Sequence, residues 1–291
     1  MSILIDQDTR VLVQGITGSV GSFQARIMLD YGTNIVAGVT PGKGGSRFEG
    51  IPVFNDVDKA VAETEPNAAI CFVPAKFARD AALEIIQSSI PLLVLTTEGV
   101  PEKDMIEILA YARLKGTRVV GPDTPGIIAP GICKLGVHPA MMYKRGSVGL
   151  VSKSGALSYE VGRVMSAAGI GQTTVVGIGG GPIWGSRQAE IIQMFFADPE
   201  TQAVVMLGEV GGRMELEAAE FIGKHPEKPV VAMIVGRSAP EGAQMGHAGA
   251  IIEGHEGTAQ GKIEALRAAG VKVATKPKEI PQLLKETGIK A

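Results

Sequence analysis

A histidine among glycines and alanines is the first group in this sequence whose setting suggests chemistry. His247 lies in the tract 242–250, which reads GAQMGHAGA. Small neighbours let a substrate approach the ring, and imidazole titrates near neutral pH and can act as a nucleophile, also towards phosphorus. Most single histidines are structural or solvated, so the tract alone leaves both interpretations open. The three other histidines lack such a setting: His138, His225 and His255.

Glu209 is a carboxylate whose position in the sequence suits a site residue. It follows a predicted strand at 203–208 and precedes Val210-Gly211-Gly212. Active sites of α/β proteins gather residues at the carboxyl ends of strands. A carboxylate there could select one imidazole tautomer and stabilise the imidazolium. The alternative is an ordinary carboxylate that caps the following helix.

A glycine-rich loop at 15–21, GITGSVG, joins the first predicted strand to a helix and could bind phosphate. Helix N–H groups and the helix dipole favour an anion there. The spacing G-x-x-G-x-x-G differs from the dinucleotide pattern, and no acid follows the second strand to bind an NAD ribose. That strand is followed instead by TPGKGG, whose Lys43 suits a ligand with several phosphates, such as CoA. Otherwise these glycines only shape a loop.

A second candidate anion site is SKSGA at 152–156, which follows another strand and opens a helix carrying Tyr159. Small residues at a helix start leave its N–H groups accessible to an anion. An N-capping serine is an equally good explanation. No G-x-x-x-x-G-K-[ST], G-x-S-x-G or H-E-x-x-H motif occurs in the chain, so a nucleotide used in its chemistry must be held by another chain.

Short apolar runs alternate with helical patterns along the whole chain, which predicts two doubly wound α/β domains. The expected strands are 11–14, 34–38, 51–54, 68–73, 92–95 and 118–120, then 148–151, 173–177, 203–208, 230–235 and 272–274. The Gly- and Pro-rich stretch between them separates the halves. We expect domains at 1–125 and 146–291, with a crossover at 126–145.

The composition excludes several classes of protein. Of 291 residues 39 are glycine, and the net charge is −2 with a pI near 6.1. This charge predicts no binding to nucleic acid or to membrane surfaces. The two cysteines are isolated, the first residues do not resemble a signal peptide, and no apolar run is long enough for a membrane span. We therefore expect a cytoplasmic protein.

Three motifs taken together resemble one known family. They are GITG followed by TPGKGG, SKSG followed by Tyr159, and GHAGAI around His247. In this order and spacing they are similar to the α subunit of succinyl-CoA synthetase, the NDP-forming succinate–CoA ligase, over essentially the whole chain. The resemblance implies a Rossmann-like CoA-binding domain followed by a flavodoxin-like ligase domain.

The resemblance also implies a reaction and a set of residues. The family passes a phosphoryl group from ATP or GTP through a phosphohistidine to a carboxylic acid, and CoA then displaces phosphate. His247 matches the phosphorylated histidine and Glu209 its supporting glutamate. Positions that match the CoA site are Thr17, Gly18, Ser19, Val20, Lys43, Thr96, Thr97 and Glu98. The phosphate-binding helix start matches Ser154, Gly155 and Ala156, and a substrate-site tyrosine matches Tyr159.

A partner chain is implied as well. In the family, ATP or GTP with Mg²⁺ binds an ATP-grasp β subunit, in an αβ complex or a dimer of αβ, and the α subunit needs no metal site of its own. A glycine-rich loop carrying His247 is suited to moving between the nucleotide and acyl sites.

Some positions depart from the family pattern. Gly181 stands where an aspartate is common, Asp123 where asparagine is usual, and Lys153 where arginine is usual; Ala156 replaces a threonine. A normally basic stretch contains Glu241, Ala243 and Gln244. Because lysine lacks the bidentate fork of arginine, anion recognition at 153 could change. We hypothesise an acid other than succinate, such as malate, citrate or sulfoacetate; the other alternative is a non-catalytic CoA-binding regulatory module. Trp184, the only tryptophan, is a candidate specificity residue.

Overall fold

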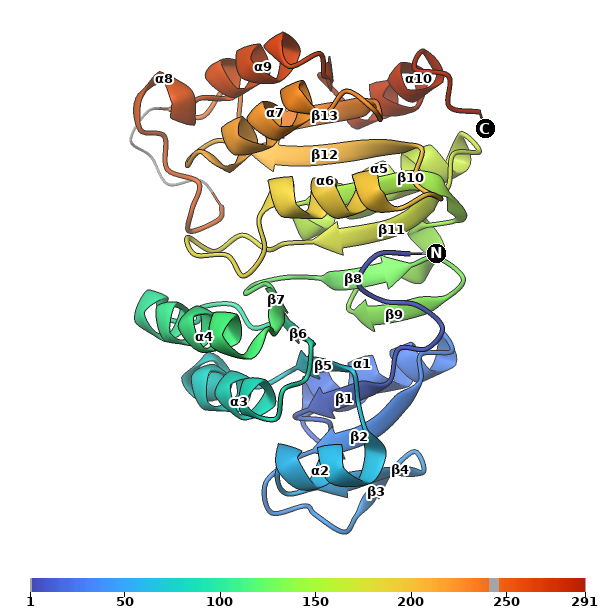
Figure 1. Cartoon of the computed structure of the whole chain (residues 1–291), viewed down its shortest axis with the longest axis vertical. Helices are drawn as coiled ribbons and strands as arrows, with labels where there is room; N and C mark the ends of the chain where they lie inside the picture. The colour runs from blue at the N-terminus through green and yellow to red at the C-terminus, as the bar shows by residue number, and fades with distance from the viewer. Residues whose placement is uncertain (1, 241–245, 291) are drawn as a thin grey trace.

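Buried apolar runs form the strands of this protein, as the alternating pattern predicts. The computed structural model describes residues 2–240 and 246–290, and within them the strands form two seven-stranded sheets. Each sheet belongs to one α/β domain, and the two domains are stacked along the long axis of the molecule (Figure 1). The predicted fold class is confirmed.

The first sheet has the strand order β3-β4-β2-β1-β5-β6-β7. Its strands are β1 (Val11–Gln14), β2 (Ile35–Val39), β3 (Arg47–Phe48), β4 (Ile51–Phe54), β5 (Ala68–Cys71), β6 (Leu92–Leu95) and β7 (Arg118–Val120). All pair in parallel except β3, which pairs antiparallel with β4. Without β3, this is the order of a Rossmann dinucleotide-binding sheet.

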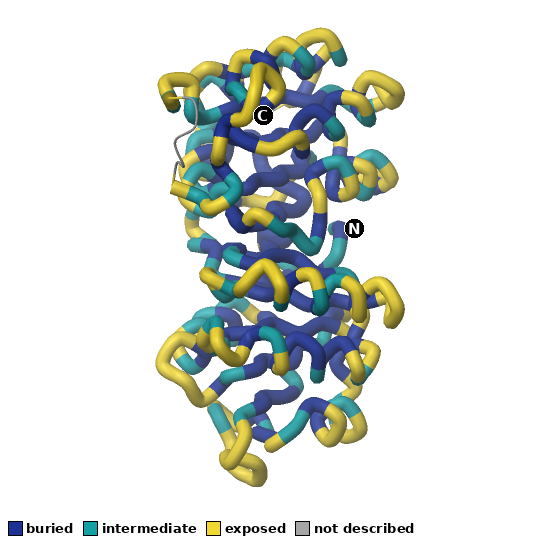
Figure 2. Tube along the Cα trace, turned by 90° about the vertical axis from the view of Figure 1, so that its left-hand side faces the viewer, coloured by how far each residue is buried: buried dark blue, intermediate teal, exposed yellow. Residues whose placement is uncertain are grey.

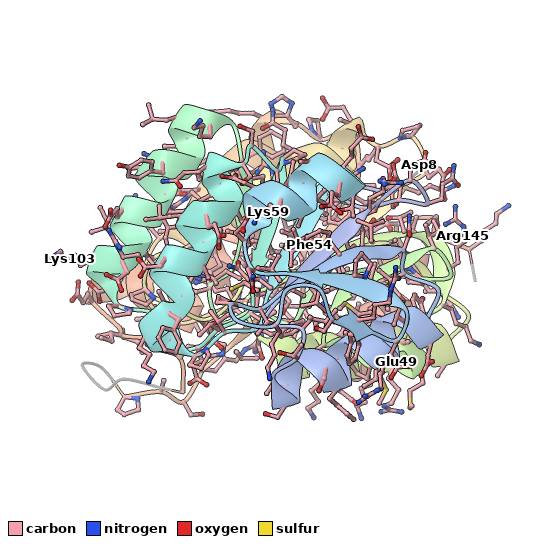
Figure 3. All side chains as sticks on the ribbon, turned by 90° about the horizontal axis from the view of Figure 1, so that it is seen from below. Asp8, Glu49, Phe54, Lys59, Lys103 and Arg145 are labelled. Carbon is pink, nitrogen blue, oxygen red and sulfur yellow. The ribbon has the colours of Figure 1, made fainter. Side chains whose placement is uncertain are left out.

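Helices cover both faces of the first sheet. They are α1 (Ser19–Asp30), α2 (Val57–Thr64), α3 (Ala75–Gln87) and α4 (Glu102–Lys115). Seen from below, α2, beside Lys59, and α1, beside Glu49, lie on opposite faces (Figure 3). Local chemistry sets the helix ends: Asp56 caps α2 by accepting from the Lys59 N–H at 2.9 Å, and Gly116 ends α4 at φ +74°.

The second sheet has the order β14-β13-β12-β10-β11-β8-β9. Its strands are β8 (Gly126–Ala129), β9 (Cys133–Gly136), β10 (Arg145–Ser152), β11 (Gln172–Gly177), β12 (Ala203–Glu209), β13 (Val230–Val235) and β14 (Lys272–Ala274). The five parallel strands β10 to β14 have the flavodoxin order. Around them lie α5 (Gly155–Ala167), α6 (Gln188–Ala197), α7 (Met214–Lys224), α8 (Gly254–Gly257), α9 (Ala259–Ala268), α10 (Ile280–Lys285) and the 3₁₀ turns η1 (Ala140–Met142) and η2 (Pro277–Glu279).

The stretch 126–145, expected as a crossover, contributes the antiparallel hairpin β8–β9 to the second sheet. Gly126 and Gly136 interrupt the apolar pattern by which these strands would be recognised in the sequence. Both have positive φ, and a Cβ on either would lie about 2 Å from a backbone oxygen. We propose that the domain boundary lies between β7 and β8.

One cluster of buried apolar side chains extends through both domains, and each domain also has a cluster of its own. The shared cluster includes Val13 of β1 and Val204 of β12, and buried backbone runs through the whole length of the molecule (Figure 2). The Thr33 hydroxyl also donates to the Lys134 carbonyl oxygen at 2.7 Å, from the first domain to β9. Among the described residues, no helix is long and apolar enough to cross a membrane.

Candidate active site

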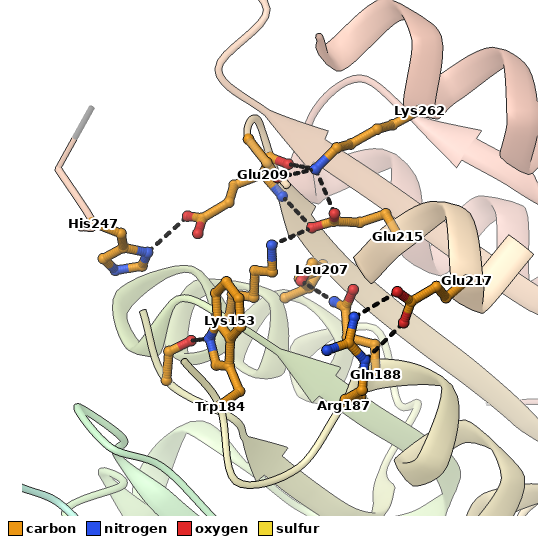
Figure 4. Close-up of polar contacts among 12 residues, drawn as sticks. Lys153, Trp184, Arg187, Gln188, Leu207, Glu209, Glu215, Glu217, His247 and Lys262 are labelled. Carbon is orange, nitrogen blue, oxygen red and sulfur yellow. Dashed lines mark hydrogen bonds and ion pairs between the residues drawn. The ribbon is translucent and has the colours of Figure 1, made fainter. Parts of the chain in front are cut away.

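His247 and Glu209 are brought into contact by the second domain. Glu209 is the last residue of β12, and His247 lies in the segment between β13 and α8. Nδ1 of the histidine is 2.7 Å from Oε2 of the glutamate (Figure 4). The carboxylate accepts, so in the neutral imidazole Nδ1 carries the proton and Nε2 keeps its lone pair. The Glu209 side chain is 9% exposed and the imidazole 27%, so the ring remains accessible.

The charges around His247 favour its protonated form. The hydrogen bond with Glu209 raises the pKa of His247, and the charges of Glu209 and Asp123 act in the same direction. Burial and the charge of Lys153 oppose this rise in pKa. The neutral, nucleophilic imidazole therefore accumulates only as the pH passes this raised pKa.

A cavity of about 330 Å³ lies between the two domains beside His247. Glu98 and Asp123 line it from the first domain and the following connection, and Gly180 and His247 line it from the second domain. Burial, with the charge of Glu98, raises the pKa of Asp123. A second cavity of about 230 Å³ is lined by Glu209 and His247. The imidazole thus borders space on two sides.

The SKSG motif forms the start of α5. The Ser154 hydroxyl caps the helix by accepting from the Leu157 N–H at 3.3 Å, and Gly155 is the first helical residue. The capping interpretation therefore holds, yet the first N–H groups of an α-helix have no partner within the helix. A Cβ on Gly155 would lie 3.5 Å from a side-chain carbon of Pro125, so this helix start packs against the connection that follows β7.

Tyr159 lies one turn further along α5. It is half-buried, its ring meets that of His138 edge-on at a centroid distance of 5.6 Å, and burial raises its pKa. His138 itself is fully buried, whereas His225 and His255 are exposed.

The positions that resemble a CoA site follow the carboxyl ends of the strands β1, β2 and β6. In the sheet, β2 and β1 are adjacent, and β5 lies between β1 and β6. The Thr17 hydroxyl donates to the Thr40 hydroxyl at 3.1 Å, which joins the loop after β1 to the loop after β2. Ser19 is the first residue of α1, Gly18 is its N-cap, and Val20 is exposed. The first N–H groups of α1, which have no partner within the helix, follow directly on the loop that Thr17 joins to Thr40, as an anion site needs.

The loop that carries Lys43 is held by a residue that sequence reasoning missed. Oδ1 of Asn55 accepts from the N–H groups of Gly42 and Gly44 at 2.9 and 2.8 Å. The Lys43 side chain is exposed. An amide residue directly after the strand β4 was the available signal, because Asn side chains commonly bond nearby backbone groups.

Thr96 and Thr97 use their hydroxyls within the fold. They donate to the carbonyl oxygens of Cys71 and Val73 at 2.7 and 2.8 Å, so they tie the end of β6 to the end of β5. Glu98 is different, because it faces the interdomain cavity together with His247. The structure therefore places one residue of the expected CoA set close to the histidine.

Comparisons with known proteins agree with this geometry. A family model described as CoA binding domain matches residues 6–99, and one described as CoA-ligase matches residues 151–272. The chain is 51% identical over 282 residues to the ADP-forming succinate–CoA ligase subunit alpha of Aquifex aeolicus, covering 96% of this chain and 92% of the relative. For the subunit alpha 1 of Archaeoglobus fulgidus, the identity is 52% over 276 residues, covering 94% of each.

This chain belongs to the succinate–CoA ligase α-subunit family. It is thus one subunit of a CoA ligase, as the sequence motifs imply. A solved ATP citrate lyase of Methanothrix soehngenii, in complex with citrate and coenzyme A, superposes with a TM-score of 0.89 at 26% identity. That match covers 99% of this chain and 52% of the lyase, so the chain spans about half of the lyase chain.

The departures from the pattern of succinate–CoA ligase α subunits lie in different places. Gly181 and Asp123 line the interdomain cavity beside His247. Lys153 is buried elsewhere: its side chain is 1% exposed and forms an ion pair with Glu215 at 2.9 Å. Because α7 buries a carboxylate opposite Lys153, its charge is already paired, and an effect of this position on anion recognition stays a prediction. Glu241, Ala243 and Gln244 lie outside the described residues.

Trp184, singled out by its uniqueness, packs beside these groups. Its indole N–H donates to the Gly179 carbonyl oxygen at 3.0 Å, and Nζ of Lys153 lies 5.0 Å from the ring centroid. A Cβ on Gly249 would lie 3.0 Å from the same indole, so the segment after His247 rests against it. The indole therefore contacts the histidine segment, and a direct role in selecting the acid stays a prediction.

Proposed function

We propose that this chain is the α subunit of an ADP- or GDP-forming acid–CoA ligase in which His247 carries the phosphoryl group. The observation that supports this most directly is the contact of Nδ1 of His247 with Glu209 beside a cavity shared by the two domains. The contact leaves Nε2 as the nucleophile, at a place that both a phosphoryl donor and the carboxylic acid can approach.

In the proposed reaction, Nε2 of His247 attacks the terminal phosphorus of the nucleotide, and the bond to the diphosphate oxygen breaks. A carboxylate oxygen of the acid then attacks the same phosphorus, which breaks the N–P bond and gives an acyl phosphate. The CoA thiolate finally attacks the acyl carbon, forms the thioester and releases inorganic phosphate. Glu209 holds the Nδ1 proton throughout and stabilises positive charge on the ring.

Phosphate on His247 adds negative charge that needs compensation. We assign this task to the N–H groups at the start of α5, at Ser154, Gly155 and Ala156. A helix N-terminus contributes about 0.3–1 kcal/mol for an exposed charge and more in a partly buried site. This modest stabilisation suits a phosphate that must leave again. Tyr159, one turn along the same helix, is assigned to the wall of the acid site.

The CoA site is assigned to the joined loops after β1 and β2 and to the end of β6. Its residues are Thr17, Gly18, Ser19, Val20, Lys43, Thr96, Thr97 and Glu98. The two loops contact one another through Thr17 and Thr40, and the start of α1 offers N–H groups to a phosphate.

Replacing Lys43 with alanine is expected to raise the KM for CoA about two- to fivefold with little change in kcat. An exposed charge pair of this kind contributes about 0.3–1 kcal/mol, and salt screens it. Steady-state kinetics at two ionic strengths measure the effect, which shrinks at high salt. The control is Lys103→Ala, at the start of α4, and an equal KM for CoA in the Lys43 and Lys103 variants contradicts the assignment.

Gly180→Ala tests the geometry around the histidine. A Cβ on Gly180 would lie 2.5 Å from Cγ and Cδ2 of His247, which is too close for the ring to stay in place. We expect phosphorylation of His247 to slow about 10- to 100-fold, the scale of a displaced reacting group. The neighbouring Gly181→Ala is a matched control, because its Cβ would meet Pro122 at an ordinary 3.4 Å. Equal rates in the two variants contradict the prediction.

For the partner, we propose an ATP-grasp β subunit that holds the nucleotide and Mg²⁺, in an αβ complex or a dimer of αβ, in the cytoplasm. The curated relatives are named ADP-forming, which supports ATP as the donor. Co-purification followed by mass measurement in solution determines the assembly.

For the acid, the names of the curated relatives support succinate, while the departures at Gly181 and Asp123 keep malate, citrate and sulfoacetate as alternatives. The deciding experiment gives the purified two-chain complex a panel of these acids and measures kcat/KM for each. A wide margin for succinate establishes it as the substrate, and a wide margin for another acid rejects it. A complex that forms no acyl-CoA and takes no label from ATP supports the non-catalytic regulatory module instead.

A further inference from the structure

Three buried charged side chains lie directly behind Glu209. Glu215 of α7 forms ion pairs with Lys153, which follows β10, and with Lys262 of α9, at 2.9 and 2.5 Å. The two lysine side chains and the glutamate are between 0 and 1% exposed. Figure 4 shows this group, here called the buried charge network, on the side of Glu209 away from His247.

The buried charge network holds both peptide groups of Glu209. The Glu209 N–H donates to Oε1 of Glu215 at 3.1 Å, and Nζ of Lys262 donates to the Glu209 carbonyl oxygen at 2.8 Å. Nζ of Lys262 also donates to the Gly211 carbonyl oxygen, two residues further on. The backbone at the end of β12 is therefore fixed on either side of the residue whose carboxylate contacts His247.

Burying three charges is an expensive way to stabilise a fold. Apolar side chains of similar volume often stabilise a protein as well as, or better than, a buried ion pair, so such a group is weak evidence for a role in stability. Here two of its hydrogen bonds converge on the backbone of Glu209, whose side chain the proposed reaction uses, and a third holds Gly211 two residues further on. That convergence points to orientation of the carboxylate.

We propose that Lys153, Glu215 and Lys262 are positioning residues that aim the Glu209 carboxylate at Nδ1 of His247. The inference deepens the proposed function and rests on it for its catalytic meaning. None of the three residues touches the reacting atoms, so each acts through Glu209.

The variant Lys262→Met distinguishes positioning of the Glu209 carboxylate from a direct effect of the lysine charge on the pKa of His247. The charges that act on His247 are those of Glu209 of β12, Asp123 after β7 and Lys153 after β10, and Glu98 after β6 lines the same cavity. Removal of a nearby positive charge by itself raises a histidine pKa. Loss of the aimed carboxylate lowers it, towards the ordinary value of about 6.5. The two explanations therefore predict opposite directions.

The experiment titrates His247 in the full chain by NMR, with the His247→Asn spectrum identifying its resonance among the four histidines. We expect the His247 pKa to fall in Lys262→Met. The matched control is Lys272→Met, because Lys272 forms an exposed ion pair with Glu286 at 2.8 Å in the same domain. An unchanged or higher His247 pKa in a folded Lys262→Met chain overturns the proposal.

A second variant keeps the test decisive if Lys262→Met does not fold. The triple variant Lys153→Met, Glu215→Leu and Lys262→Met replaces the whole network by apolar side chains, an exchange that buried ion groups commonly tolerate. It removes a net positive charge, so a lowered His247 pKa again indicates lost positioning, and a raised or unchanged one overturns the proposal.

The same variants are then assayed in the two-chain complex with labelled ATP. We expect phosphorylation of His247 to slow about 10- to 100-fold, the usual effect of removing a group that orients a reactive side chain. Wild-type rates in the folded triple variant overturn the inference. A wild-type complex that takes no label contradicts the proposed function instead, while the NMR titration still decides whether the network positions Glu209.

Discussion

His247→Asn is expected to remove all acid-labile phosphate from the two-chain enzyme and to lower acyl-CoA formation at least about 10³-fold, as loss of a covalent nucleophile does. The amide nitrogen of asparagine has no free lone pair, so it cannot take the phosphoryl group that Nε2 of His247 accepts. The measurement incubates the complex with ATP labelled at its terminal phosphate, and tests the label on the chain for stability in acid and in base.

The matched control for this variant is His255→Asn. His255 lies in the short helix α8, is exposed, and contacts Glu264 with its ring at 3.1 Å, so it is also a histidine beside a carboxylate. We expect it to keep full labelling. CoA binding should survive in His247→Asn, because the assigned CoA loops lie in the other domain. Acid-labile label that persists in His247→Asn places the phosphate elsewhere.

Glu209→Gln is expected to have the second largest effect, a decrease of about 10- to 100-fold in the rate of His247 phosphorylation. Glutamine has nearly the same shape but no negative charge. Its amide oxygen can still accept a hydrogen bond from Nδ1–H, but it no longer stabilises the positive charge that develops on the ring as the N–P bond forms. Single-turnover labelling of the complex measures this rate without the later acyl steps.

The pH dependence of the labelling rate in Glu209→Gln is a second, independent test of the contact between Glu209 and His247. Because the hydrogen bond with Glu209 raises the pKa of His247, the wild-type labelling rate should increase with pH until the pH exceeds that raised value. Removing the carboxylate lowers the His247 pKa, so the midpoint of the Glu209→Gln profile moves to lower pH while its plateau is lower. The stability that the ion pair contributes is fully present below the unfolded pKa and is lost as the pH rises through the raised folded pKa.

Glu264→Gln is the control for both measurements, because it neutralises the carboxylate that contacts exposed His255. We expect its labelling rate and pH profile to match the wild type. A Glu209→Gln profile whose midpoint stays in place, or moves to higher pH, contradicts the assigned contact between Glu209 and His247.

Much of the fold was predictable from local sequence. Strand and helix periodicity are local properties of the chain, so the runs at 11–14, 51–54 and 118–120 have the expected bounds as β1, β4 and β7. The hairpin β8–β9 was not predicted, because closely packed glycines interrupt its pattern and its pairing depends on β11, almost fifty residues away. The motifs also identified the family, because loops that bind phosphate need particular small residues at particular spacings.

The sequence by itself determined which chemical groups this protein has: a histidine among small residues, loops suited to phosphate, and no nucleotide motif of its own. Only the tertiary structure decided what those groups meet. The order of the parallel strands brings Glu209 to His247, places Glu98 in the same cavity, and buries Lys153 against a glutamate of α7. The reason is physical: a side chain's pKa and orientation depend on burial and on charges from distant segments, which residue spacing along one segment does not specify.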